Sequence, residues 1–170
     1  EMLQISLVLL FFLLLIIPTG NYLYHIATGQ RTFADPVFDR VDNIIYKLCG
    51  IKQEDMSWKK YAFSMLLTNA VMTILAYVIL RMQSIPLLNP NGISGMEPSL
   101  SFNTVISFMT NTNLQHYSGE SGLSYLSQIL VIIFMMFTSA ATGFSVAMAF
   151  IRGLSGKVTS LGNFYVDFTR

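Results

Sequence analysis

The feature that most constrains this chain is the presence of three long apolar runs without Asp, Glu, Lys or Arg. They cover residues 2–26, 61–80 and 123–151. A helix that rises ~1.5 Å per residue needs about 20 residues to cross a hydrocarbon core of ~30 Å, and each run is long enough. Only 11% of the residues are charged, whereas soluble domains carry about 25%. The pattern predicts an all-α integral membrane protein with three spanning helices.

The first run has an alternative interpretation, a cleaved secretory signal peptide. Such peptides begin with basic residues and end near a cleavage site of small residues. Here only Glu1 precedes the run, and PTGNYLYHIATG ends and follows it. We therefore expect residues 1–26 to form a retained transmembrane helix.

The basic residues are distributed in a way that predicts the orientation in the membrane. Because Lys and Arg favour the cytoplasmic side, the basic segment 27–60 is expected to be a cytoplasmic loop and the amino terminus to lie outside. Residues 153–170 are expected to be cytoplasmic as well, whereas the stretch 83–122 has no Lys or Arg. Within the first loop, ADPVFDRVDNIIYKLCG predicts a short amphipathic interface helix. The basic residues of that loop are Arg31, Arg40, Lys47, Lys52, Lys59 and Lys60.

The connection between the second span (61–82) and the third (122–152) contains a helix too short to cross a membrane. An outer loop at 83–98 is rich in Pro and Gly, which favour turns. The stretch SLSFNTVISFM then predicts a helix over 99–109, capped by Ser99 or Ser101. Its length of about 15 Å is half a bilayer. A half-length helix enclosed by two spans indicates a re-entrant loop.

A polar segment, residues 110–115, follows this short helix. It supplies carbonyl and side-chain oxygens but no full charge. The carboxyl end of the helix carries partial negative charge, which stabilises a cation. Potassium filters are rings of carbonyl oxygens, whereas divalent cations prefer carboxylates. The segment thus fits an extended filter strand for a monovalent cation, and an ordinary extracellular loop is the alternative that the pattern leaves open.

Several blocks of the sequence resemble one known family. SFNTVISFMTNTNLQHYSGESGLSYLSQ is similar to the first pore loop of the channel-like A subunit of Kdp-type potassium-transporting P-type ATPases. VDNIIYKLCGIKQEDMSWKKYAFSMLLTN, MQSIPLLNPNG, SAATGFSVAMAFIRGLSG and LGNFYVDFTR follow the family's order. The resemblance implies a potassium-channel-like fold of four span–pore helix–span repeats after an extra first helix. This chain would hold the extra helix, the first repeat (61–152) and the lead-in to the second (153–170).

The resemblance also implies which residues contact the ion. Asn113 stands where related filter strands usually have Gly, and Asn tolerates left-handed backbone angles. Leu114 stands where the family usually has Trp, so an aromatic partner behind the strand is missing. The implied filter residues are Thr110, Asn111, Thr112, Asn113 and, just behind them, Gln115.

The resemblance implies a function and partners as well. The chain is expected to be part of the potassium-binding, translocating subunit of an ATP-driven importer in the bacterial inner membrane. Its partners would be an ATP-hydrolysing B subunit, a C subunit, a small F subunit and the lipid bilayer, with no nucleic acid. The chain has no phosphate-cradling loop, nucleophile–base pair or phosphorylated Asp motif, so we expect no catalytic residue and no ATP site. The alternatives are a passive homotetrameric potassium channel and a membrane scaffold or assembly factor.

Two further groups of residues are candidates for a role. His116 and Glu120 are four positions apart, but two ligands without a third are weak evidence for a metal, and we expect them at the outer mouth. There Glu120 would raise the local cation concentration. Ser139, Gly143 and Ala147 recur every four residues, which predicts close helix packing, with a hinge at Gly143 as the alternative. No metal other than potassium is expected.

Overall fold

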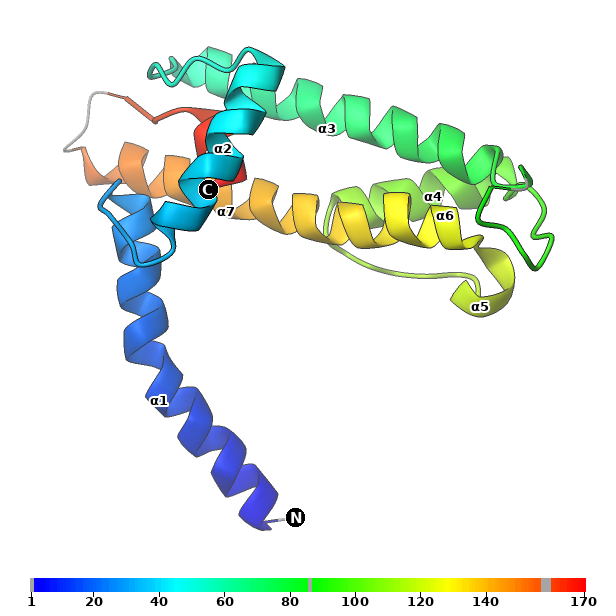
Figure 1. Ribbon diagram of the computed structural model, residues 1–170, viewed down its shortest axis with the longest axis horizontal. Helices are drawn as coiled ribbons and strands as arrows, with labels where there is room; N and C mark the ends of the chain where they lie inside the picture. The colour runs from blue at the N-terminus through cyan, green and yellow to red at the C-terminus, as the bar shows by residue number, and fades with distance from the viewer. Residues whose placement is uncertain (1, 86, 157–159) are drawn as a thin grey trace. The chain divides into compact units, whose positions relative to one another are not determined.

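The computed structural model describes residues 2–85, 87–156 and 160–170, and all regular structure in these ranges is helical. Three of the described helices are long and apolar enough to cross a membrane: α1, α3, and the continuous helix formed by α6, η1 and α7. The all-α membrane class is thereby confirmed. The elements (Figure 1) are α1 (Met2–Ala27), α2 (Asp35–Cys49), α3 (Trp58–Arg81), α4 (Pro98–Met109), α5 (Gly119–Gly122), α6 (Tyr125–Ser127), the π-helix η1 (Gln128–Ile133), α7 (Phe134–Ser155) and α8 (Phe164–Thr169).

The chain divides into two units, residues 1–52 with 170 and residues 53–169. In the first unit, α1 has no buried residue, as expected of a helix surrounded by lipid. The amphipathic helix expected in the following segment is α2. It ends at Cys49 and is capped by Gly50, whose φ of 63° suits a residue without a Cβ atom.

In the second unit, α3 is followed by a connection to α4 that is held together by two buried amides. The side chain of Asn89 donates to the carbonyls of Gln83 and Ile93 and accepts the Ile93 N–H. The side chain of Gln83 donates to the carbonyls of Ser94 and Gly122. These bonds join the end of α3 to both arms of the connection, so the loop has a defined shape without regular structure.

The short helix α4 begins one residue earlier than the sequence predicted, and the expected cap is wrong. Glu97 is the N-cap, and its carboxylate accepts the Leu100 N–H at 2.8 Å and the Ser99 hydroxyl at 2.7 Å. Pro98 occupies the first helical position, where a missing N–H costs nothing. Ser101 is instead fully buried and bonds the Glu97 carbonyl.

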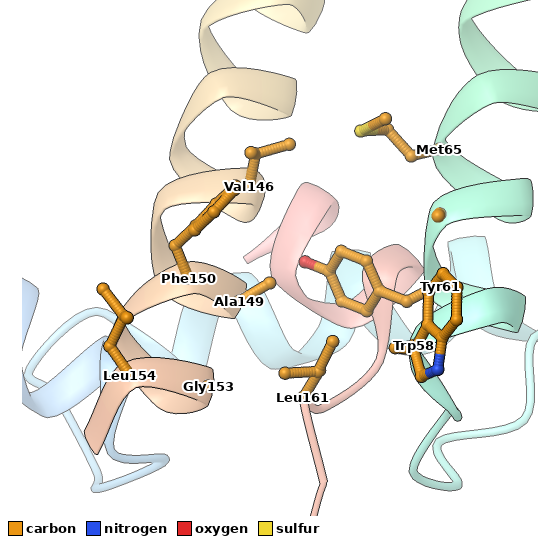
Figure 2. A pocket seen from close by; sticks show the side chains of 10 residues that line it. Trp58, Tyr61, Met65, Val146, Ala149, Phe150, Gly153, Leu154 and Leu161 are labelled. Carbon is orange, nitrogen blue, oxygen red and sulfur yellow. The ribbon is translucent and has the colours of Figure 1, made fainter. Parts of the chain in front are cut away.

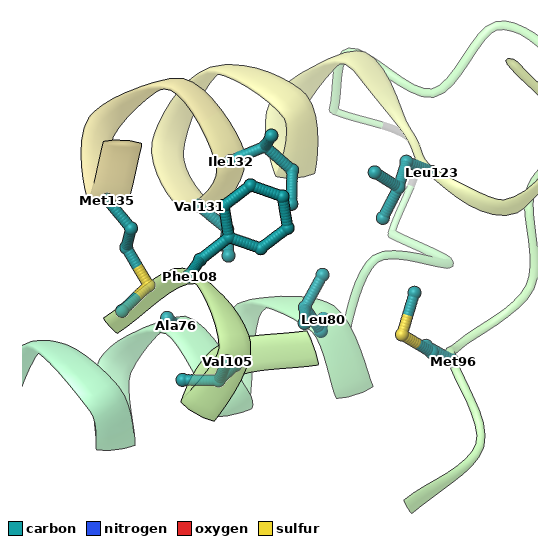
Figure 3. Packing of buried hydrophobic residues seen from close by; sticks show 9 residues of the cluster. All are labelled: Ala76, Leu80, Met96, Val105, Phe108, Leu123, Val131, Ile132 and Met135. Carbon is teal, nitrogen blue, oxygen red and sulfur yellow. The ribbon is translucent and has the colours of Figure 1, made fainter. Parts of the chain in front are cut away.

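An apolar cluster fixes α4 against its neighbours (Figure 3). α4 packs against both α3 and α7, and η1 packs against α3. Phe108, near the end of α4, is only 2% exposed and lies at the centre of these contacts. The members of the cluster are Ala76, Leu80, Met96, Val105, Phe108, Leu123, Val131, Ile132 and Met135.

The third spanning helix starts later than the expected residue 122. Leu123 is extended, and the Ser124 hydroxyl caps the helix by accepting the Ser127 N–H at 3.2 Å. The next turns form the π-helix η1, which no periodicity in the sequence indicated.

At the opposite end of α3 and α7, the short helix α8 (red in Figure 1) packs against both. Phe164 is fully buried there and lies edge-on to the Tyr61 ring, with centroids 5.6 Å apart. Arg152 makes an ion pair with Asp167, with N–O distances of 2.6 and 2.9 Å. This end of the unit is closed by aromatic packing and by paired charges.

Candidate ion-binding loop

The polar loop, residues 110–115, leaves the carboxyl end of α4 and turns its backbone N–H groups back toward that helix. The N–H groups of Thr110 and Asn111 donate to carbonyls in the last turn of α4. Those of Thr112 and Asn113 both donate to the Ser107 carbonyl, at 2.9 and 3.2 Å. These four N–H groups are therefore all bonded from one side, by α4.

Ser107 also binds the far end of the loop through its side chain. Its hydroxyl accepts the Leu114 N–H at 2.7 Å and lies 3.0 Å from the Leu114 carbonyl, to which it donates. The sequence analysis missed this residue. The only signal for it was a hydroxyl among the apolar residues of the last turn of α4.

The carbonyl oxygens of residues 110–113, which we call the loop carbonyls, remain without hydrogen bonds. In the part of the chain that the structure describes, no N–H or O–H group donates to any of them. Several side chains of the loop bond to one another: the Thr110 and Thr112 hydroxyls are 2.9 Å apart, and Asn113 donates to the Asn111 amide oxygen. Four consecutive carbonyl acceptors are thus available to a ligand.

The backbone of the loop is not the extended strand that the sequence predicted. Asn111 and Asn113 both have a φ of 57°, in the left-handed region. Asn tolerates this region better than most residues because its short polar side chain can bond locally. The conformation departs from a strand because the N–H groups fold back onto Ser107 instead of pairing with a neighbouring strand.

The predicted filter residues come together in this loop, and all of them are exposed within the chain. The Asn111 side chain also contacts α7, where the Ser139 hydroxyl donates to its amide oxygen at 3.4 Å. Leu114 is 59% exposed. Tyr117, two positions after the loop, packs against the apolar cluster. The sequence did not indicate this aromatic contact beside the loop.

The candidates for the outer mouth do not share a helix. α5 begins only at Gly119, so His116 precedes it while Glu120 lies within it. Both are exposed, and the Glu120 carboxylate accepts a bond from the Ser118 hydroxyl at 3.4 Å. Among the described residues, no group of three His, Cys, Asp or Glu side chains is arranged to hold a metal.

The small residues of α7 do not form one buried stripe. Ser139 is buried, whereas Gly143 and Ala147 are exposed in this chain. A step of four residues advances about 40° beyond a full turn, so the stripe rotates away from the packed face, which continues through Ser145 and Ala149. A Cβ atom added at Gly143 would meet no atom within 4 Å.

A cavity of about 360 Å³ lies between α3 and α7, near α8 (Figure 2). Its walls are apolar and include Met65, Val146, Phe150 and Leu161. Such walls offer no ligands to a cation, so this cavity is a poor candidate for an ion site.

Comparison with known proteins identifies relatives over the whole chain. A family model described as "Potassium-transporting ATPase A subunit" matches residues 6–170. A protein of Clostridium acetobutylicum, called a potassium-transporting ATPase potassium-binding subunit, is 57% identical over 171 aligned positions, which cover 100% of this chain and 30% of the relative. A protein of the same name from Caldanaerobacter subterraneus subsp. tengcongensis is 57% identical over 154 positions, covering 90% of this chain and 28% of the relative. The chain thus spans less than a third of the length of these relatives.

Proposed function

We propose that this chain, which belongs to the family of potassium-transporting ATPase A subunits, contributes one loop of a potassium-selective filter. The whole protein would bind and translocate potassium in an ATP-driven importer. The observation that carries this proposal is the set of four loop carbonyls without hydrogen bonds. The N–H groups of the same four residues all donate to carbonyls of α4.

Carbonyl oxygens in this arrangement suit a cation that sheds its water. Unbonded acceptors in a membrane protein are tolerated where water or an ion solvates them. Rings of carbonyl oxygens replace the hydration shell of potassium in channels. The loop has no carboxylate, which divalent cations would favour.

The electrostatics around the loop favour a cation as well. The carboxyl end of α4 points its partial negative charge toward the loop. Residues 83–122 contain no Lys or Arg that would oppose a cation. The nearby Glu120 would add a negative charge at the mouth and raise the local cation concentration.

One loop cannot surround an ion, so the remaining ligands would come from elsewhere. We propose that three further loops of the same subunit complete the filter, as the family resemblance implies. The energy would come from an ATP-hydrolysing B subunit, with a C subunit and a small F subunit in the complex. The subunit would lie in the bacterial inner membrane with its amino terminus outside, which agrees with the positions of Lys and Arg.

The test is the potassium dependence of ATP hydrolysis by the complete complex that carries this sequence. The variant Gln115→Arg places a cation beside the loop, which should repel potassium. At an effective dielectric constant of about 20, a charge about 8 Å away changes the binding free energy by about 2 kcal/mol. Since tenfold in affinity corresponds to about 1.4 kcal/mol, the half-maximal potassium concentration should rise at least about tenfold.

The matched control is Asn91→Arg, which adds the same charge at an exposed position of the connection between α3 and α4. It should leave the potassium curve nearly unchanged. If Gln115→Arg gives the parent's curve, the loop is not in the ion path and the proposal is wrong. Potassium flux without ATP would favour a passive channel, and full transport after replacement of both Asn111 and Asn113 would favour a scaffold.

A further inference from the structure

We propose that Ser107 is a positioning residue that sets the ion selectivity of the polar loop, an inference that rests on the function proposed above. Ser107 belongs to α4 and not to the loop, and it would not contact the ion. It acts by fixing where the loop carbonyls lie.

Ser107 holds the loop at two points. Its backbone carbonyl accepts the N–H groups of Thr112 and Asn113 in the middle of the loop. Its hydroxyl makes both hydrogen bonds available to the Leu114 backbone, at 2.7 and 3.0 Å. Among the described residues, no other side chain of α4 bonds to the loop.

The anchor itself is fixed in place. The next residue, Phe108, is 2% exposed, and Val105, two positions before Ser107, is 1% exposed. Both belong to the apolar cluster that lies where α4 packs against α3 and α7. A loop tied to a rigid helix keeps its ligands at defined positions, which a functional site requires.

The hydroxyl is the part of this anchor that a substitution can remove without changing the helix. In Ser107→Ala, the Leu114 N–H loses its acceptor and the Leu114 carbonyl its donor, while the bonds to the Ser107 carbonyl remain. The end of the loop is then free to move. A loop that relaxes around ions of different size should discriminate between potassium and sodium less well.

Selectivity is measured as the ratio of the half-maximal sodium and potassium concentrations that stimulate ATP hydrolysis by the complete complex. In Ser107→Ala, the half-maximal potassium concentration should rise roughly tenfold. This rise corresponds to about 1.4 kcal/mol, which lies within the range expected for the loss of two hydrogen bonds. The sodium value should change much less, so the ratio falls. The maximal rate should be little affected, because the rest of the fold is intact.

Two variants make the test specific. Ser107→Thr keeps the hydroxyl and should retain the parent's ratio. Ser101→Ala, on the same helix, removes a buried hydroxyl that bonds only the carbonyls of Met96 and Glu97 at its amino end. This control should leave the ratio unchanged. If Ser107→Ala does not assemble, Ser107→Cys carries the test, because a thiol is a weak donor and should lower the ratio in part.

Parallel shifts of the potassium and sodium curves in Ser107→Ala would overturn the inference, as would an equal loss of selectivity in Ser101→Ala. Either result would mean that the hydroxyl only stabilises the helix. A parent complex without preferential stimulation by potassium would instead overturn the proposed function itself. The two failures are therefore distinguishable.

Discussion

Two short segments fold back against the same pair of helices, α3 and α7, and they satisfy their polar groups in opposite ways. At one end, the N–H groups of residues 110–113 donate to carbonyls of α4, and the loop carbonyls have no partners among the described residues. At the other end, α8 joins a network in which the polar groups satisfy one another. Arg152 pairs with Asp167, and the Tyr61 hydroxyl lies within 3.0 Å of the same carboxylate.

The difference supports the proposal that the polar loop, and not the end closed by α8, holds a ligand. Buried polar groups that bind one another stabilise one arrangement and need nothing further. Unbonded carbonyls in a chain that spans a membrane need water or an ion. The same pair of helices thus carries a self-satisfied polar network at one end and carbonyl acceptors without protein donors at the other.

The largest expected effect comes from a matched pair of substitutions, Phe108→Ala and Phe164→Ala. Both rings are buried, at 2% and 0% exposure, one at each end. Each loss should lower the free energy of unfolding by about 3 kcal/mol or more, which thermal unfolding of the purified complex would measure. Only Phe108→Ala should also raise the half-maximal potassium concentration, since Phe108 fixes the helix that holds the loop.

Equal effects of the two Phe variants on the potassium dependence would contradict the comparison. They would mean that both ends determine ion binding, or that neither does so locally.

The second expected effect is the loss of the ion pair in Arg152→Ala. The Arg152 and Asp167 side chains are 22% and 10% exposed. Removal of one partner from such a pair should cost about 3 kcal/mol, because a largely buried carboxylate then lacks its counter-charge. Thermal unfolding of Arg152→Ala and of the double variant Arg152→Ala/Asp167→Ala measures this cost.

The double variant should recover part of the stability, and both should keep the parent's ratio of sodium to potassium half-maximal concentrations. A changed ratio in either one would show that the closed end also controls selectivity.

The apolar pattern predicted the large elements well, because it depends on length and composition alone. The spanning helices and the half-length helix before the polar segment are present close to the expected positions. The charge-free runs that predicted them need no knowledge of tertiary contacts.

The hydrogen-bonded details were not predictable from the sequence, because the choice of partner depends on the folded structure. Gln83 meets Gly122 across 39 positions, and Ser107 meets Leu114 across a turn with two left-handed residues. A hydroxyl or amide in the sequence does not say which carbonyl it will bind. The extended strand was wrong for the same reason, since residues 110–113 bind back to α4.

A smaller effect is expected from Gly95→Ala in the connection between α3 and α4. An added Cβ atom would lie 2.5 Å from the Arg81 carbonyl oxygen, so the backbone of α3 or of this connection must shift. Such overpacking should cost about 1–3 kcal/mol. Gly143→Ala is the control, since its Cβ would meet no atom within 4 Å. Thermal unfolding should show a clearly lower stability for Gly95→Ala than for Gly143→Ala. Equal stability would mean that the connection between α3 and α4 accommodates the added Cβ atom without a loss of stability.

The smallest expected effect is a pH dependence at the amino end of α4. Hydrogen bonds from the Ser99 side chain and from the backbone lower the pKa of Glu97 below its ordinary value. A carboxyl whose pKa is lower in the folded state stabilises the fold above its unfolded pKa of about 4.3, and this contribution is lost as the pH falls through the folded value. The parent should therefore lose slightly more stability on acidification than Glu97→Gln, whose amide does not titrate. Glu120→Gln, which removes a carboxylate outside α4, should follow the parent. If Glu97→Gln and the parent lose stability equally as the pH falls, the charge of the Glu97 cap does not stabilise α4, and the apolar cluster alone holds this helix.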